Sequence, residues 1–267
     1  MYKAFFGMEF NPFSKGIDTK HYFESDDFKQ ATARLEHLKN IKGIGVFTGG
    51  PGMGKTFAMR CFVNSLNPNL YKVVYIPLST VTVIEFYKSL AYELDIEVSC
   101  RKIDLFRDIQ SRLRSLVTDK KLTPVIIIDE AQYLKTAVLD DLKLLLNFEM
   151  DSKNYATLIL TGQSVLNHTL SKQVHEALKQ RVVISYNFNG ISKDDVEKYI
   201  TSRFELCGVH NKIFDDNATS ALHACSGGSV RKLNSVIERC LMIAYSQNKT
   251  TINTDIVMAA QNETELM

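Results

Sequence analysis

The sequence has no tryptophan, only 5 prolines, and 5 cysteines without any C-x-x-C spacing. An odd number of scattered cysteines favours reduced thiols over a disulfide framework or a zinc site. No apolar run is long enough to span a bilayer, and Lys3, Glu9 and Asn11 interrupt the aromatic N-terminus, which therefore lacks the apolar core of a signal peptide. We expect a cytoplasmic protein that makes no contact with a membrane.

The composition is that of a folded enzyme-sized protein. Hydrophobic residues make up 45% of the 267 positions and charged residues 23%, which excludes disorder as the main state. The formal net charge of +2 is too small to indicate nucleic-acid binding by itself. Any such partner must therefore be inferred from local charge.

Apolar runs that suit strands alternate with helical patterns as far as residue 188, and one of the expected helices spans roughly 137–149. The expected strands cover residues 44–49, 72–78, 124–134, 156–163 and 181–188. This alternation predicts a parallel sheet with helices on both faces, a three-layer α/β/α core. After Asn189 the strand signal disappears, and four successive helical segments follow. Their expected starts are Ser192, Asp215, Ser229 and Thr254, and the expected stops are Gly208 and Gly227-Gly228. We expect a leader over residues 1–40, a core over 41–189 and a helical domain over 190–267.

The stretch TGGPGMGKTF, residues 48–57, fits the P-loop pattern G-x-x-x-x-G-K-[ST]. Glycines let consecutive backbone N–H groups wrap phosphates, and the N-terminus of the following helix adds a positive end. An ordinary glycine turn is the alternative, but an expected strand precedes the loop and an expected helix follows it. The pattern predicts an ATP and Mg²⁺ site, with Lys55 on the phosphates and Thr56 on the metal. The candidate nucleotide-binding residues are Gly49, Gly50, Pro51, Gly52, Met53, Gly54, Lys55, Thr56, Phe57 and Asp129.

Asp129 and Glu130 follow an apolar run, PVIII, at the end of an expected buried strand, where open α/β sheets bind ligands. This suits a Walker B motif, in which Asp129 holds Mg²⁺ and Glu130 polarises the attacking water. A helix N-terminus would also suit Asp followed by Glu. The letters DEAQ occur in helicases too, but the helical tail leaves no room for a second RecA-like domain.

The order of motifs resembles that of the AAA+ ATPases. The motifs are GGPGMGKT, IIIDE, ILTGQ, an arginine after a helix, and GGSVRKLN. The resemblance implies a sensor 1 at Thr161 or Gln163, an arginine finger at Arg181 that acts on a neighbouring subunit's ATP, and a sensor 2 at Arg231. Each role has a simpler alternative. Thr161 and Gln163 could belong to an ordinary turn after a strand, Arg181 could be a surface arginine beside a strand, and Arg231 could be a solvated charge on a helix.

A narrower resemblance is to the ExeA, TnsC and IstB-like group, carried by MYKAFFGMEFNPFS, YFES, LTGQSVL and LKQRV. It implies that the aromatic residues in 10–13 and 22–23 lie near the adenine, although core packing would also explain them. Secretion-type members are expected to carry a membrane span and a cell-wall-binding region. The lack of these segments after the expected helical domain, which would be the lid of such an ATPase, favours the compact transposition helpers.

A basic helix is expected within residues 101–114. Positive side chains recur on it with few acids, and in the resembled group the corresponding helical insert faces DNA. A solvated amphipathic helix is the alternative. The candidate DNA-binding residues are Arg101, Lys102, Arg107, Arg112 and Arg114.

The resemblance implies a homo-oligomeric ring or helical filament on double-stranded DNA. It would recruit a transposase and, in some systems, a target-selector protein, with ATP hydrolysis driving disassembly. A secretion or envelope-assembly ATPase and a nucleotide-switch scaffold are alternatives, and a clamp loader or replication initiator is a weaker one.

Overall fold

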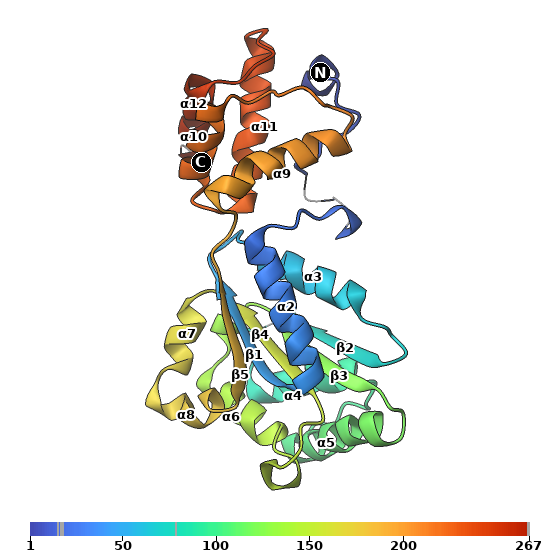
Figure 1. Cartoon of the computed structure of the whole chain (residues 1–267). Coiled ribbons are helices and arrows are strands. Elements are labelled where there is room, and N and C mark those ends of the chain that lie inside the picture. Colours follow the sequence, from blue (N-terminus) through green and yellow to red (C-terminus); the bar gives the residue numbers. More distant parts are fainter. Residues whose placement is uncertain (15, 17–18, 78, 266–267) are drawn as a thin grey trace. The chain divides into compact units, whose positions relative to one another are not determined.

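The computed structural model describes residues 1–14, 16, 19–77 and 79–265 (Figure 1). The chain divides into two compact units. One comprises Met1–Gln30, Gly50–Gly54 and Asn189–Met267, and the other comprises Ala31–Gly49 and Lys55–Phe188. Across the described residues, no helix combines the length and apolar character that crossing a membrane requires. The predicted boundaries of leader, core and helical domain stay predictions.

The second unit is built on a parallel five-stranded sheet in the described residues. Its order is β2-β3-β4-β1-β5, and every neighbouring pair is parallel. The near-continuous apolar runs of β3 and β4 are buried, as expected for central parallel strands. The α/β prediction is thus confirmed, while Leu78, in the predicted strand 72–78, lies outside the described residues. The strands are β1 (Gly43–Gly49), β2 (Tyr71–Ile76), β3 (Thr123–Ile128), β4 (Thr157–Gly162) and β5 (Val182–Phe188).

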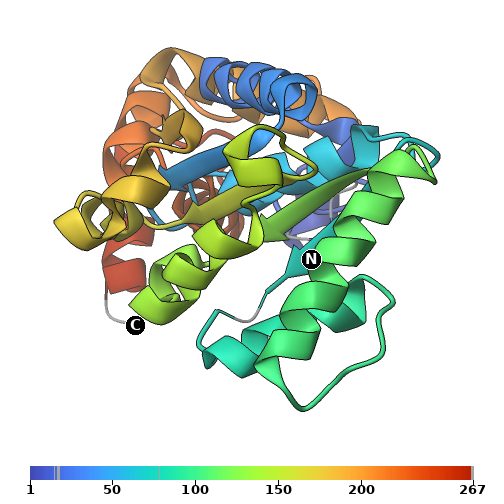
Figure 2. The ribbon, with the colours of Figure 1, turned by 90° about the horizontal axis from the view of Figure 1, so that it is seen from below.

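Helices cover both faces of this sheet (Figures 1 and 2). On one face lie α3 (Lys55–Ser65) and the part of α2 (Asp26–Ile41) that belongs to this unit. The other face carries α4, α5 and α6, whose apolar residues form one core with the strands. Helix α4 spans Val83–Glu93, α5 spans Lys102–Thr118 and α6 spans Thr136–Leu145. The short α7 (Val165–Leu170) and α8 (Glu176–Lys179) precede β5.

Two predicted elements are too long. The strand predicted over 124–134 ends at Ile128, because Glu130 adopts a left-handed conformation, with φ of 50°, that cannot continue a strand. The helix predicted over 137–149 ends at Leu145, and a separate 3₁₀ turn follows at Glu149–Asp151. Both errors arise where the backbone turns sharply while the sequence remains apolar or helix-compatible.

The first unit contains the helices that the sequence predicts after residue 189. Three of them begin at the predicted N-caps Ser192, Asp215 and Ser229, whose side chains accept backbone N–H bonds, and Gly227 ends α10 in a left-handed conformation. The N-terminal segment, with the short α1 (Tyr2–Phe5), contributes Phe6, Met8 and Phe13 to the same core. The bounds are α9 (Lys193–Leu206), α10 (Asp216–Ser226), α11 (Val230–Ser246) and α12 (Thr254–Glu265).

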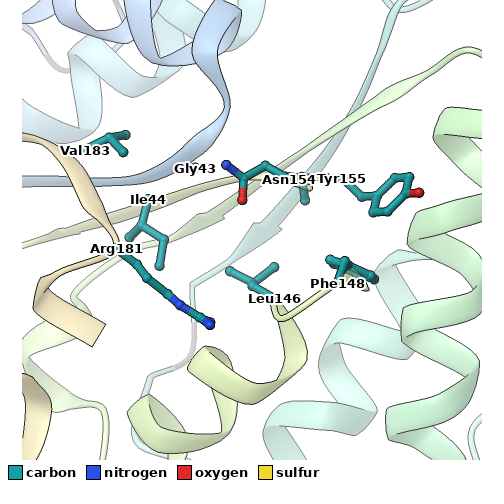
Figure 3. Close-up of a pocket in the computed structure, with 9 residues that line it drawn as sticks. Gly43, Ile44, Leu146, Phe148, Asn154, Tyr155, Arg181 and Val183 are labelled. Carbon is teal, nitrogen blue, oxygen red and sulfur yellow. The ribbon is translucent and has the colours of Figure 1, made fainter. Parts of the chain in front are cut away.

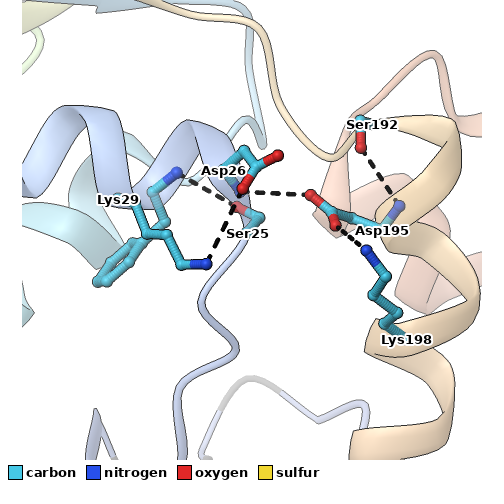
Figure 4. Close-up of polar contacts among 7 residues, drawn as sticks. Ser25, Asp26, Lys29, Ser192, Asp195 and Lys198 are labelled. Atoms are coloured by element: carbon cyan, nitrogen blue, oxygen red, sulfur yellow. Dashed lines mark hydrogen bonds and ion pairs between the residues drawn. The ribbon is translucent and has the colours of Figure 1, made fainter.

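A buried carboxylate fastens the start of α2 to α9 within this unit (Figure 4). Asp195 accepts hydrogen bonds from the backbone N–H of Asp26, at 3.3 Å, and from Lys198 Nζ, at 3.3 Å. Burial by itself would raise the pKa of Asp195, but the hydrogen bonds from Asp26, Lys198 and Ser192 outweigh it and lower that pKa. The ionised form therefore stabilises the folded state.

We expect Asp195→Asn to lower the free energy of unfolding by about 1–3 kcal/mol at pH 7, the worth of hydrogen bonds to a charged group. Because the folded pKa is lowered, this contribution is present above the unfolded value of about 3.9 and is lost as the pH falls through the folded value. Urea unfolding at pH 7 and at a series of acidic values measures the difference.

Asp194→Asn, an exposed neighbour on the same helix, is the control and should change stability by no more than about 0.5 kcal/mol. Equal stability of Asp195→Asn and the wild type at neutral pH would contradict the assignment.

Candidate nucleotide site

The P-loop motif links β1 to α3, as its sequence context predicts. Lys55 is the first residue of α3, and its buried Nζ donates a hydrogen bond to the Gly49 carbonyl at 2.8 Å. Gly52 and Gly54 have φ values of 77° and 95°, which L side chains rarely adopt. The shape of the loop thus depends on glycine, and the charged Lys55 lies where the loop joins α3.

Asp129 lies at the carboxyl edge of the sheet, where it is buried and accepts hydrogen bonds from two hydroxyl groups. It is 6% exposed, and its Oδ2 accepts hydrogen bonds from the Thr56 hydroxyl at 3.3 Å and the Tyr75 hydroxyl at 3.0 Å. A carboxylate beside a hydroxyl is the oxygen donor set that Mg²⁺ prefers. The residues present therefore fit a magnesium ion at Thr56 and Asp129.

Two residues around Asp129 were missed in the sequence. Burial, followed by the charge of Asp129, raises the pKa of Tyr75 to about 12, so this phenol keeps its proton near neutral pH. The Ser79 hydroxyl donates to the backbone carbonyl of Asp129. The sequence offered no signal for either contact, because both depend on the pairing of β2 with β3, the strand that precedes Asp129.

Glu130 projects from the turn after β3 and is exposed. Gln132 Nε2 donates to Glu130 Oε2 at 2.6 Å, and the backbone N–H of Gln163 donates to Gln132 Oε1 at 2.9 Å. Gln163 is half-buried beyond the end of β4. Thr161, the other sensor 1 candidate, is fully buried, and its Oγ1 finds no hydrogen-bond partner within the described part of the chain. Gln132 was not singled out from the sequence.

The middle of the P-loop contacts the start of α11 within the first unit. The Arg231 N–H donates to the Gly52 carbonyl at 3.5 Å, and the Ser229 hydroxyl donates to the Pro51 carbonyl at 3.2 Å. A Cβ at Gly52 would lie 2.8 Å from Arg231 Cβ, so only glycine permits this approach. The structure therefore brings the sensor 2 candidate Arg231 to the loop.

Arg181 lies just before β5, at the amino edge of the sheet, whereas Asp129 lies at the carboxyl edge. Its Nη1 donates to the Lys143 carbonyl at 2.6 Å. The same side chain lines a cavity of about 200 Å³ beside β1 and β5 (Figure 3). Because all the strands are parallel, Arg181 and Asp129 lie at opposite edges of the sheet. The other lining residues are Gly43, Ile44, Leu146, Phe148, Asn154, Tyr155, Ala156 and Val183.

The five basic residues proposed for DNA contact differ in their surroundings. Arg101 pairs with Asp104 at 2.6 Å, and Lys102 pairs with the buried carboxylate of Asp141 at 2.6 Å. Arg112 Nε donates to the Leu94 carbonyl at 3.0 Å, and its guanidinium lies 3.8 Å from Asp95. The remaining two, Arg107 and Arg114, are exposed on α5.

The N-terminal aromatic residues pack against helices of the first unit. Phe13 makes an edge contact with Phe204 at 5.3 Å between ring centroids, and Phe23 makes one with Tyr199 at 5.6 Å. Core packing therefore explains these two side chains, and their placement near an adenine stays a prediction.

Comparison with known proteins agrees with this geometry. Residues 39–170 match the family model described as an AAA domain. General secretion pathway protein A of Aeromonas hydrophila is 32% identical over 97% of this chain and 48% of its own length, so the chain spans about half of that relative. ATP-dependent target DNA activator B of Escherichia phage D108 is 27% identical over 92% of this chain and 74% of its own length.

The fold also matches solved structures. The ORC2 protein of Aeropyrum pernix superposes with a TM-score of 0.67 at 13% identity, covering 95% of this chain and 71% of that one. At this identity the likeness concerns the fold alone. The parallel sheet, the P-loop with its lysine, the acidic turn after β3 and the family match lead to one conclusion: the chain contains an AAA domain of the P-loop ATPase type.

Proposed function

We propose that this ATPase is a DNA-binding regulator of transposition that oligomerises on double-stranded DNA and recruits or activates a transposase. The observation that carries the proposal is its relationship to a target DNA activator, aligned over 92% of this chain and 74% of the relative. ATP binding would favour assembly, and hydrolysis would drive disassembly. Either a ring or a helical filament satisfies this scheme.

The chemistry of hydrolysis follows from the residues at the carboxyl edge of the sheet. Lys55 would neutralise the β- and γ-phosphates, while Thr56 and Asp129 would hold Mg²⁺, which when bound would offset phosphate charge. Glu130 accepts the proton of the attacking water, since it is an exposed carboxylate beside Asp129. Gln163 is the better sensor 1 candidate, because Thr161 is sealed in the sheet.

Arg181 completes the site of a neighbouring subunit. Its position at the amino edge of the sheet supports a role in trans, since the site of its own chain is at the other edge. A guanidinium there would offset the charge that develops on the transferred phosphoryl group. Hydrolysis would then require assembly. Arg231 would report the γ-phosphate from the helical domain.

DNA binding would rest mainly on Arg107 and Arg114. These side chains are exposed on α5, whereas Arg101, Lys102 and Arg112 have protein partners that they would have to leave or share. Contacts from arginine to phosphate position a protein without reading base sequence.

A second candidate is a secretion or envelope-assembly ATPase. It is favoured by the higher identity, 32%, to General secretion pathway protein A. Such a protein would respond to a membrane-bound partner and not to DNA. The two functions share the ATPase chemistry and differ in what stimulates turnover.

The first test compares ATP turnover and sedimentation with Mg-ATP, in the presence and absence of double-stranded DNA. We expect DNA to stimulate turnover and ATP to drive assembly, and we expect Arg181→Ala to slow turnover by about 10³-fold, while each monomer still binds ATP. Turnover and assembly indifferent to DNA would contradict the transposition proposal and favour the secretion role.

A second prediction concerns the proposed base. Glu130→Gln keeps the size of the side chain but cannot accept the proton, so we expect ATP binding within about twofold of the wild type and at least about 10²-fold slower turnover. If hydrolysis drives disassembly, the variant should accumulate as DNA-bound oligomers in sedimentation. Unchanged turnover would refute Glu130 as the base.

A third prediction concerns α5. Replacing both Arg107 and Arg114 by alanine should weaken DNA binding for all sequences. The slope of log affinity against log salt should become shallower by about 1 for each phosphate that an arginine no longer neutralises. The control is the pair Lys172→Ala and Lys249→Ala, two exposed lysines that belong to other segments of the chain than α5. An unchanged salt slope in the arginine variant would exclude this helix from the DNA interface.

A further inference from the structure

We infer that Gln132 is a positioning residue for hydrolysis, which holds the Glu130 carboxylate and ties it to the end of β4. The inference rests on the proposed role of Glu130 as the base. It concerns a side chain that the P-loop, Walker B and sensor motifs do not include. The three groups involved, Glu130, Gln132 and Gln163, come from the turn after β3 and the residue after β4, all within one compact unit.

The hydrogen-bond pattern determines which way the carboxamide faces. The backbone N–H of Gln163 can only donate, so the Gln132 atom at 2.9 Å from it must be the oxygen. The other end of the amide is then the NH₂ group, which donates to Glu130 Oε2 at 2.6 Å. One oxygen of Glu130 is thus engaged by a donor, while its Oε1, for which the described residues provide no hydrogen-bond donor, is left for the proton of a water.

The end of β4 is shaped to admit this carboxamide. Gly162 lies beside it, and a Cβ at that position would overlap Gln132 Oε1 and come within 3.3 Å of the backbone nitrogens of Ala131 and Gln132. Gly162 has no φ in the left-handed region, so its backbone conformation does not require glycine. Space for the Gln132 side chain is the reason that the structure offers for a glycine there.

The backbone of Glu130 adds to the same constraint. This residue has φ of 50° and ψ of 37°, a conformation that costs a non-glycine residue about 1–2 kcal/mol and persists only where surrounding contacts hold it. Its N–H donates to Asp129 Oδ1 at 2.9 Å. The main chain of Glu130 is therefore held by a hydrogen bond to Asp129, and its carboxylate by one from Gln132.

A fixed carboxylate matters because misplacing a catalytic group by about 1 Å can lower a rate about 10²-fold. We expect Gln132→Ala to lower kcat by about 10- to 100-fold while the Kd for ATP stays within about twofold, because Gln132 contacts neither Lys55 nor Asp129 in the described interactions. Stopped-flow nucleotide binding and steady-state turnover with DNA separate the two quantities. Thermal unfolding checks that the variant is folded.

Shape and hydrogen bonding are separated by two further variants. Gln132→Met keeps the approximate length without a donor, and Gln132→Glu keeps an acceptor for Gln163 but sets a negative charge against Glu130. Both should be as slow as Gln132→Ala. Gly162→Ala should also be slow, because its methyl group displaces the carboxamide. Wild-type turnover in Gln132→Met would show that the side chain only fills space and that its hydrogen bonds are not needed, which would overturn the inference.

Combination with Glu130→Gln tests whether Gln132 acts through the carboxylate. In that background, Gln132→Ala should cause no further decrease in kcat, whereas independent effects would multiply. The matched control is Gln110→Ala, another half-buried glutamine whose amide donates to a backbone carbonyl, that of Leu145, away from this edge; it should keep wild-type turnover.

The outcomes also separate this inference from the proposed role of Glu130. If Glu130→Gln turns over at the wild-type rate, the base assignment fails and the inference fails with it. If Glu130→Gln is inactive while Gln132→Ala is fully active, the base assignment stands and only the positioning role of Gln132 is wrong.

Discussion

The burial of one carboxylate, Asp129, organises the carboxyl edge of the sheet. A carboxylate that is 6% exposed must be surrounded by donors, and it receives them from α3 through Thr56, from β2 through Tyr75 and from its own turn through the Glu130 N–H. Segments far apart in the sequence are thereby held around one pair of oxygens. The same arrangement supplies the hydroxyl and carboxylate that a magnesium ion requires.

The parallel sheet places two groups of candidate site residues at opposite edges. The P-loop lysine, Asp129 and Glu130 follow the carboxyl ends of strands, while Arg181 precedes the amino end of β5. A single chain therefore does not bring its own Arg181 to its own Asp129. If Arg181 acts in hydrolysis, the missing charge must come from another copy, and this would couple turnover to assembly.

The acidic turn after β3 and the end of β4 form one hydrogen-bonded unit. Gln132 accepts from the Gln163 backbone and donates to Glu130, and the absence of a side chain at Gly162 leaves room for it. A change in the position of β4 would therefore move the amide and, with it, the Glu130 carboxylate. The sensor 1 candidate Gln163 and the proposed base Glu130 are in this way parts of the same local structure.

Motifs that are contiguous in the chain were predictable, because local backbone requirements determine them. The glycines and Lys55 of the P-loop, the apolar strand before Asp129 and the N-caps Ser192, Asp215 and Ser229 all act within a few residues of themselves. The alternation of strands and helices likewise predicted the parallel sheet. Its strand ends were less certain, as Glu130 illustrates, since a left-handed residue leaves no apolar signature.

Contacts between distant segments were decided by the tertiary structure alone. Nothing in the sequence indicates that Tyr75 meets Asp129, that Lys102 pairs with Asp141, or that Gln132 reaches Gln163. These pairs depend on strand order, which places β2 and β4 on either side of β3, and on which face each side chain occupies. The sequence by itself determined the ATPase chemistry, because it resides in short motifs. The fold decided which side chains support that chemistry and which basic residues are left exposed, because burial and pairing arise only when the elements pack.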